Sequence, residues 1–275
     1  MADEPLRADL DDAALAAALD AHTAAYFAGY GALPGAAFRD DGGVQRLVSG
    51  LPVDLFNVVV LARLAPAAAD AAIAAALAEF RARGLPFVWH VGPTSAPADL
   101  PARLLAHGLA HYEDEPGMAA DLSAAPPVAP APAGLEIRRV ADPAALRAWV
   151  ELWVGPAPAP VVEACAFAMG GVPHGPRADR ELLLGLLGGR PVAIAELFVG
   201  AGVASVQHVV TAPDARRRGI GAALTGAVLA AARARGYRHV VLTASPAGFG
   251  VYARLGFRPF CTVRRYVPAP QPAAG

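Results

Sequence analysis

Residues 213–224 read Pro-Asp-Ala-Arg-Arg-Arg-Gly-Ile-Gly-Ala-Ala-Leu; the stretch follows an apolar strand pattern and opens a helical one. Gly219 and Gly221 would let backbone N–H groups approach an anion with no Cβ in the way. The start of the following helix adds unpaired N–H donors and about half a positive charge. The stretch therefore predicts a cradle for a pyrophosphate group.

Two other phosphate-binding motifs do not fit this stretch. A dinucleotide fingerprint needs a third small residue where Leu224 stands, and an acidic residue about 20 positions later, where residues 239–241 read His-Val-Val. A Walker loop needs a lysine, and all 23 basic residues of the chain are arginines. Both alternatives are excluded.

Strands and helices alternate on both sides of the cradle in the C-terminal half. Strand patterns occupy residues 135–140, 181–187, 191–199, 203–211, 239–244 and 260–267, and helical patterns occupy 143–153, 219–235 and 249–255. Asp142 before Pro143 predicts a capped helix start, and Gly236 predicts a helix stop. The pattern predicts an α/β (α+β) domain with a mainly antiparallel sheet.

The N-terminal half repeats part of this order. Strand patterns at 56–62 and 87–91 alternate with helical patterns at 67–83 and 98–107. Residues 81–84 and 233–236 both read Arg-Ala-Arg-Gly. We interpret the match as an internal repeat; the alternative is that composition alone repeats the four residues.

A Pro/Ala-rich stretch separates the two halves. Residues 124–134 read Ala-Ala-Pro-Pro-Val-Ala-Pro-Ala-Pro-Ala-Gly, which suits an extended linker and no regular helix or central strand. We therefore predict one domain over 1–123 and a second over 135–275.

Two linked motifs carry a family resemblance. Arg216, Gly219 and Gly221 fit a pattern of glutamine or arginine, two residues, glycine, one residue and glycine, and residues 252–257 read Tyr-Ala-Arg-Leu-Gly-Phe. With these motifs the chain resembles the GNAT superfamily of acyl-CoA-dependent N-acyltransferases over residues 135–267. The resemblance implies two GNAT-like domains, and transfer of acetyl from acetyl-CoA to a primary amine of a small molecule by direct attack in a ternary complex.

The resemblance also implies the site. Backbone amides would bind the pyrophosphate at Arg216, Arg217, Arg218, Gly219, Ile220, Gly221 and Ala222. Val209 and Thr211 would pair with the pantetheine arm, and Ser245 stands where family members often have an asparagine that contacts CoA. Tyr252 would protonate the leaving thiolate; the alternative for Tyr252 is a packing role.

The general base is harder to find. An alkylammonium acceptor must lose a proton at a cost of about 4.6 kcal/mol at pH 7. Strand alternation turns Ser205 and Gln207 to the reacting face, and neither is a useful base. His208 should face the other way unless a bulge turns it. Glu196 on the preceding strand is the next candidate, and a water chain is the alternative.

The N-terminal half resembles a degenerate copy of the same fold. Residues 63–69, where its glycine loop should lie, contain no glycine, and Leu104 or Leu105 occupies the place of Tyr252. We expect one cofactor site, in the C-terminal half. The irregular segment 155–180 is expected to gate the acceptor.

Composition excludes several classes of function. With 23 basic and 24 acidic residues, the net charge of −1 disfavours nucleic-acid binding, and the absence of lysine excludes Schiff-base chemistry. Two cysteines form no disulfide framework or metal motif, so no metal is expected. No apolar stretch reaches the length of a membrane span, and residues 1–4 do not start a secretory signal. We expect a cytoplasmic monomer or homodimer; the alternative function is a non-catalytic acyl-CoA-binding or regulatory protein.

Overall fold

The computed structural model describes residues 4–126 and 130–270, so residues 127–129 of the predicted linker lie outside the described residues. Internal contacts divide the chain into two units. Unit 1 comprises Met1–His22 and Pro116–Cys261, and unit 2 comprises Thr23–Glu115 and Thr262–Gly275.

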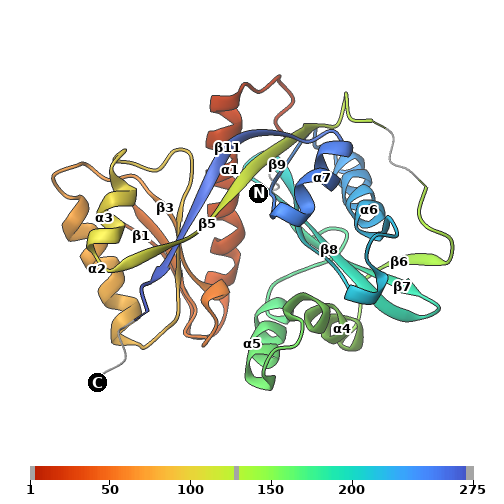
Figure 1. Cartoon of the computed structure of the whole chain (residues 1–275), viewed down its shortest axis with the longest axis horizontal. Coiled ribbons are helices and arrows are strands. Elements are labelled where there is room, and N and C mark those ends of the chain that lie inside the picture. The colour runs from red at the N-terminus through yellow and green to blue at the C-terminus, as the bar shows by residue number, and fades with distance from the viewer. Residues whose placement is uncertain (1–3, 127–129, 271–275) are drawn as a thin grey trace. The chain divides into compact units, whose positions relative to one another are not determined.

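Unit 1 is a sheet with helices packed against it (Figure 1). Its strands are β6 (Leu135–Arg139), β7 (Arg180–Leu187), β8 (Arg190–Gly200), β9 (Val203–Thr211) and β10 (His239–Thr243). Its helices are α4 (Pro143–Val154), α5 (Ala159–Gly170), the 3₁₀ turn η3 (Pro213–Ala215), α6 (Ile220–Ala234) and α7 (Pro246–Arg254). Strands β6 to β9 are consecutive antiparallel neighbours, and β10 runs parallel to β9.

Unit 2 repeats this arrangement at smaller size. Its elements are η1 (Gly29–Ala32), β1 (Ala37–Asp41), β2 (Val44–Val48), η2 (Asp54–Phe56), β3 (Asn57–Ala62), α2 (Ala69–Ala82), β4 (Val88–Val91) and α3 (Leu100–Ala106). Strands β1 to β3 are antiparallel, and β4 runs parallel to β3. The predicted α/β fold class and the internal repeat are both confirmed by this order of elements.

Three elements pass from one unit to the other along the chain: α1 (Asp12–Ala28), β5 (Leu109–Asp121) and β11 (Arg258–Pro268). The end of β5, Gly117 to Asp121, pairs antiparallel with β10 in unit 1. The end of β11, Arg264 to Tyr266, pairs antiparallel with β4 in unit 2. In each unit a strand thus pairs with one from the other half of the sequence, and the units differ from the predicted segments 1–123 and 135–275. Backbone donors and acceptors at a sheet edge take whichever strand is within reach, whatever its place in the chain.

Apolar side chains fix the helices on each sheet. In unit 1, Leu224 and Val228 of α6 pack with Val192 and Leu197 of β8 in one buried cluster. In unit 2, Ile73, Leu77 and Phe80 of α2 pack in a buried cluster with Val59 of β3 and Trp89 of β4. The helix face turned to each sheet is the apolar one, as a period of 3.6 residues requires.

Local signals placed most element ends well. Asp142 Oδ1 accepts a 2.8 Å bond from Ala145 N and caps α4 before Pro143. Gly236 has the left-handed φ of +82° expected after a helix. The segment 155–180 was expected to be irregular, but it contains α5. Pro158 is the N-cap of α5 and Pro160 lies in its first turn; a missing N–H costs nothing at these positions, so the two prolines start the helix instead of preventing it.

Among the described helices, none combines the length and the apolar character that a membrane crossing would need.

Candidate functional site

The turn between β9 and α6 exposes backbone donors at a helix start. Arg217 and Gly219 both have left-handed φ values, of +57° and +78°, and Gly219 is the N-cap of α6. The hydrogen bond from Ala223 N to Gly219 O, at 3.0 Å, closes the first turn of the helix. Helix geometry leaves the preceding amides, Ile220 to Ala222, without an intrahelical acceptor. The predicted cradle therefore has the donors that an anion needs.

Gly221 keeps open the space between the helix start and the end of β9. A Cβ on Gly221 would lie 3.6 Å from Thr211 Oγ1 and 3.8 Å from Val209 Cγ1. A longer side chain would fill the gap against β9. Arg216 Nε donates a 3.0 Å bond to Thr211 O, which ties the loop to the strand, while Arg217 and Arg218 are exposed. The residues present thus fit a pyrophosphate group at this place.

The edge of β9 beside the cradle is open along its second half. On one side β9 pairs with β8 as far as Thr211. On the other side β10 pairs with β9 at Ala204 and Ser205, and in the described residues no strand pairing is recorded there from Val206 to Thr211. Ala244, just after β10, donates from its N–H to Pro116 O of β5 at 2.9 Å, so after β10 the chain turns toward β5 and away from β9. An extended ligand could pair with this edge as an added strand.

Helix α7 and the residue that caps it contain two further predicted site residues, Tyr252 and Ser245. Ser245 Oγ accepts a 3.3 Å bond from Gly248 N and caps the helix. The Tyr252 ring stands edge-on to Phe257, with centroids 5.9 Å apart, and lies over Gly248, where an added Cβ would come within 2.8 Å of Tyr252 Cε2. The structure thus places Ser245 as a cap and the Tyr252 ring in a packed position; their roles toward CoA stay predictions.

Glu196, the predicted base, forms a buried ion pair with Arg180. Its Oε1 is 3.0 Å from Arg180 Nη1, and the two side chains are 0% and 3% exposed. Its Oε2 is 3.6 Å from His208 Nε2, and the His208 side chain is 21% exposed. Glu196 has no exposed surface with which to touch an acceptor, whereas its neighbour His208 has.

His208 reaches Glu196 because β9 bulges there. Ile194 pairs with Val210 and Glu196 with Gln207, so Ala195 alone faces the two residues His208 and Val209. His208 adopts a left-handed φ of +51°. Simple alternation predicted that His208 faces away; the extra residue turns it onto the side of Glu196. Nothing in the sequence marks the bulge, because a bulge depends on how two strands pair.

The His208 ring packs against two indoles of α4. The centroid of its ring lies 4.4 Å from that of Trp153 and 5.8 Å from that of Trp149, the latter edge-on. Trp149 is fully buried and its Nε1 donates to Ala195 O at 3.4 Å. Sequence reasoning placed neither indole in the site.

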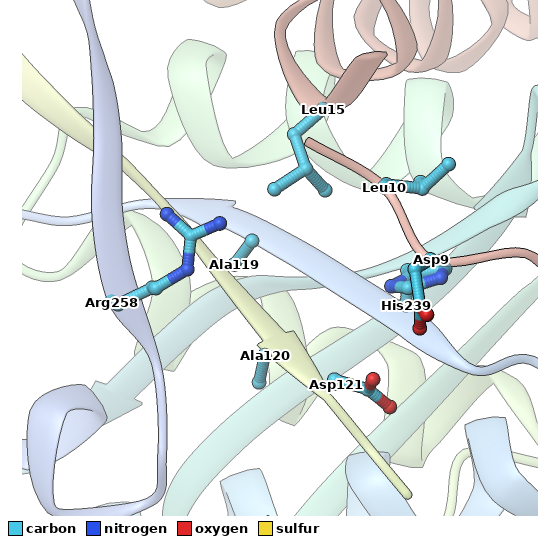
Figure 2. A pocket seen from close by; sticks show the side chains of 8 residues that line it. All are labelled: Asp9, Leu10, Leu15, Ala119, Ala120, Asp121, His239 and Arg258. Carbon is cyan, nitrogen blue, oxygen red and sulfur yellow. The ribbon is translucent and has the colours of Figure 1, made fainter. Parts of the chain in front are cut away.

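A separate hollow of about 190 Å³ lies elsewhere in unit 1. Figure 2 shows the side chains that line it: Asp9, Leu10, Leu15, Ala119, Ala120, Asp121, His239 and Arg258. Its polar groups bond to neighbouring protein groups. Hydrogen bonds from the Arg238 guanidinium hold the pKa of Asp121 well below its usual range, and His239 Nε2 lies 2.8 Å from Ala8 O. These contacts fasten residues 8 and 9 to the sheet, and no predicted site residue lies in the hollow.

Comparison with known proteins finds a matching family over the residues that include the cradle. The model of the acetyltransferase (GNAT) family matches residues 146–257. No curated protein sequence matches the chain significantly. Among solved structures, a GCN5-related N-acetyltransferase from Kribbella flavida is similar at 22% identity with a TM-score of 0.68, covering 92% of this chain and 97% of that one.

A tandem GNAT protein from the clavulanic acid biosynthesis pathway is similar at 16% identity with a TM-score of 0.60, covering 98% of this chain and 99% of that one. Likeness at these identities shows the fold, and the family model adds the domain. Residues 146–257 therefore match the GNAT family, within a chain that has the fold of a tandem GNAT protein.

Proposed function

We propose that this protein transfers an acetyl group from acetyl-CoA to a primary amine of a small molecule, by direct attack in a ternary complex. One observation carries the proposal: the open helix start at Gly219 to Ala222 lies beside the open edge of β9. An anion-binding helix start suits the pyrophosphate of CoA, and an unpaired strand edge suits its pantetheine arm.

Each part of the site has a task in this proposal. The amides from Arg216 to Ala222 would hold the pyrophosphate, and the backbone of Val209 and Thr211 would align the pantetheine arm. When bound, acetyl-CoA supplies an acetyl group activated as a thioester. The Tyr252 hydroxyl would donate a proton to the departing sulfur, a hydrogen bond that strengthens as the sulfur gains charge.

We further propose that unit 2 binds no CoA. At its corresponding junction, the edge of β3 is occupied by the protein's own chain: Ala96 N donates to Ala62 O at 2.9 Å, and Leu64 N donates to Ala96 O at 3.0 Å. Residues 63–69 contain no glycine. Unit 2 is then a degenerate copy that supports the fold.

Two measurements test the function. Titration calorimetry of the full chain with acetyl-CoA should show one site per chain. Release of free thiol should then depend on the amine supplied, in a panel of alkylamines, arylamines and amino sugars. Binding of acetyl-CoA with no thiol release from any amine would support a non-catalytic acyl-CoA-binding role instead.

A further inference from the structure

Unit 1 contains a polar cluster that the cradle does not use. Its members come from three adjacent strands: Arg180 from β7, Glu196 from β8 and His208 from β9. Glu196 stands between the other two, with one carboxylate oxygen 3.0 Å from Arg180 Nη1 and the other 3.6 Å from His208 Nε2. The cluster runs across three strands from a guanidinium group through a carboxylate to an imidazole ring.

Burial decreases along this chain toward His208. Arg180 and Glu196 are 3% and 0% exposed, and the His208 side chain is 21% exposed. A buried carboxylate is costly unless it is paired, and Arg180 pairs with this one. Of the three groups, His208 is the one that can touch a small molecule.

His208 also lies next to the part of β9 proposed to align the pantetheine arm. Thr211 and Val209 both lie beside Gly221 of the cradle, and His208 is the next residue along β9 in the direction that leads away from Thr211. The bulge and the left-handed backbone of His208 turn its ring to the Glu196 side of β9. A left-handed conformation costs free energy in a residue other than glycine, and such strain is concentrated at functional sites.

We infer that His208 is the proton acceptor for the amine and that Glu196 is the residue that positions it, an inference that rests on the proposed function. The ammonium form of the acceptor gives one proton to the imidazole ring of His208. The freed lone pair attacks the thioester carbonyl carbon; the C–N bond forms and the C–S bond breaks.

A second proton leaves the nitrogen and the sulfur gains one, so ammonium and thioester yield amide, thiol and one proton that His208 passes to solvent. The negative charge of Glu196 stabilises the imidazolium form of His208, as a carboxylate behind a catalytic histidine does. Two charged groups that the structure places near His208 are Glu196 and, behind it, Arg180. The side chains that α4 contributes, Trp149 and Trp153, do not titrate.

His208→Asn tests the base, since asparagine tolerates a left-handed backbone. Two acceptors separate proton removal from structure: phenethylamine, which is protonated at neutral pH, and phenylhydrazine, which is not. We expect kcat/KM to fall by about 100-fold or more with phenethylamine and to change little with phenylhydrazine. Acetyl-CoA affinity and Tm should match the wild type. His111→Asn, which changes an exposed histidine of unit 2, should leave both rates unchanged.

Glu196→Gln tests the positioning role. With phenethylamine we expect kcat/KM to fall by about 10-fold and the acidic limb of its pH profile to move to lower pH, because the charge that favours imidazolium is gone. Should this variant lose its fold with Arg180 unpaired, Glu196→Asp keeps a charge for Arg180 but withdraws it from His208, and should shift the limb in the same direction.

Equal slowing of both acceptors by His208→Asn, or an unmoved pH profile in the Glu196 variants, would overturn the inference while acetyl transfer by the wild type still stood. If the wild type released no thiol with any of the amines, the proposed function would fail and this inference with it.

Discussion

The two units contain the same strand–helix junction with opposite outcomes. In unit 1, Ala244 turns from β10 toward Pro116, and the edge of β9 stays open as far as Thr211. In unit 2, Ala96 returns after β4 and bonds to Ala62 and Leu64 at the end of β3. The order of elements is shared; the path of a few residues after the parallel strand differs.

A binding site of this type therefore needs two features together, one at the helix start and one at the adjacent strand edge. The helix start must lack side chains, as at Gly219 and Gly221, and the adjacent strand edge must lack a partner. Unit 2 lacks both: residues 63–69 include no glycine, and Arg63 forms a bridge with Ala96. Side chains at the helix start, or a partner on the strand edge, would each be enough to close the site.

The largest effect is expected from closing the unit 1 junction. In Gly221→Val the side chain fills the gap against Val209 and Thr211 and removes amide contacts worth about 1.5–3 kcal/mol each to a charged group. Loss of two contacts, about 3–6 kcal/mol, lowers acetyl-CoA affinity by about 150-fold to 25,000-fold. Calorimetry measures the loss.

Position 221 is a cleaner test than position 219. The φ of +78° at Gly219 strains any side chain whatever the space around it. Ala230→Val, on the exposed face of the same helix, is the matched control and should bind normally. Near-normal binding in Gly221→Val would remove the cradle from the site.

A smaller effect is expected at the helix that follows the parallel strand. Unit 1 has Tyr252 on α7, where unit 2 has the buried Leu104 on α3. Tyr252→Phe keeps the ring over Gly248 and removes the hydroxyl, so single-turnover acetyl transfer should slow by about 10- to 100-fold with unchanged acetyl-CoA binding. Equal single-turnover rates at saturating substrates would leave Tyr252 with a packing role alone.

Acid should weaken unit 2 through His90. Burial, with a contribution from Arg265, lowers the pKa of His90 to about 3 from 6.5. Between these values the unfolded chain binds a proton that the folded chain excludes, so stability falls as pH drops from about 6.5 toward 3. His90→Gln should flatten that part of the dependence of unfolding free energy on pH, by up to a few kcal/mol.

Chemical denaturation at pH 7 and pH 4 measures this effect. His239→Gln, in unit 1, is the control. The same pH dependence in wild type and His90→Gln would show that His90 does not carry it.

Adding glycine to unit 2 is expected to leave acetyl-CoA binding unchanged. In the double variant Ala67→Gly and Ala69→Gly the helix start loses its side chains, but Ala96 still occupies the edge of β3. The number of acetyl-CoA sites per chain should remain one by calorimetry. A second site would show that glycine alone opens the junction.

Prediction from sequence succeeded where the signal was local. The helix of residues 219–235, the strand of residues 203–211 and the cap at Asp142 follow from patterns within a few residues. It missed α5, because Pro158 and Pro160 read as breakers, and it missed β5. It predicted the strand at residues 260–267, but not that this strand pairs with β4 of unit 2. The roles of Ser245 and Tyr252 toward CoA remain predictions.

The sequence by itself determined the glycine-bearing helix start, the repeated order of elements and the lack of glycine in the second junction, because each depends on neighbouring residues and their backbone preferences. The pairing of β5 with β10 and of β11 with β4, and the bulge that brings His208 to Glu196, depend on the tertiary structure. Pairing between strands far apart in the chain depends on which edge is free when the sheet forms, and no short stretch of sequence records that.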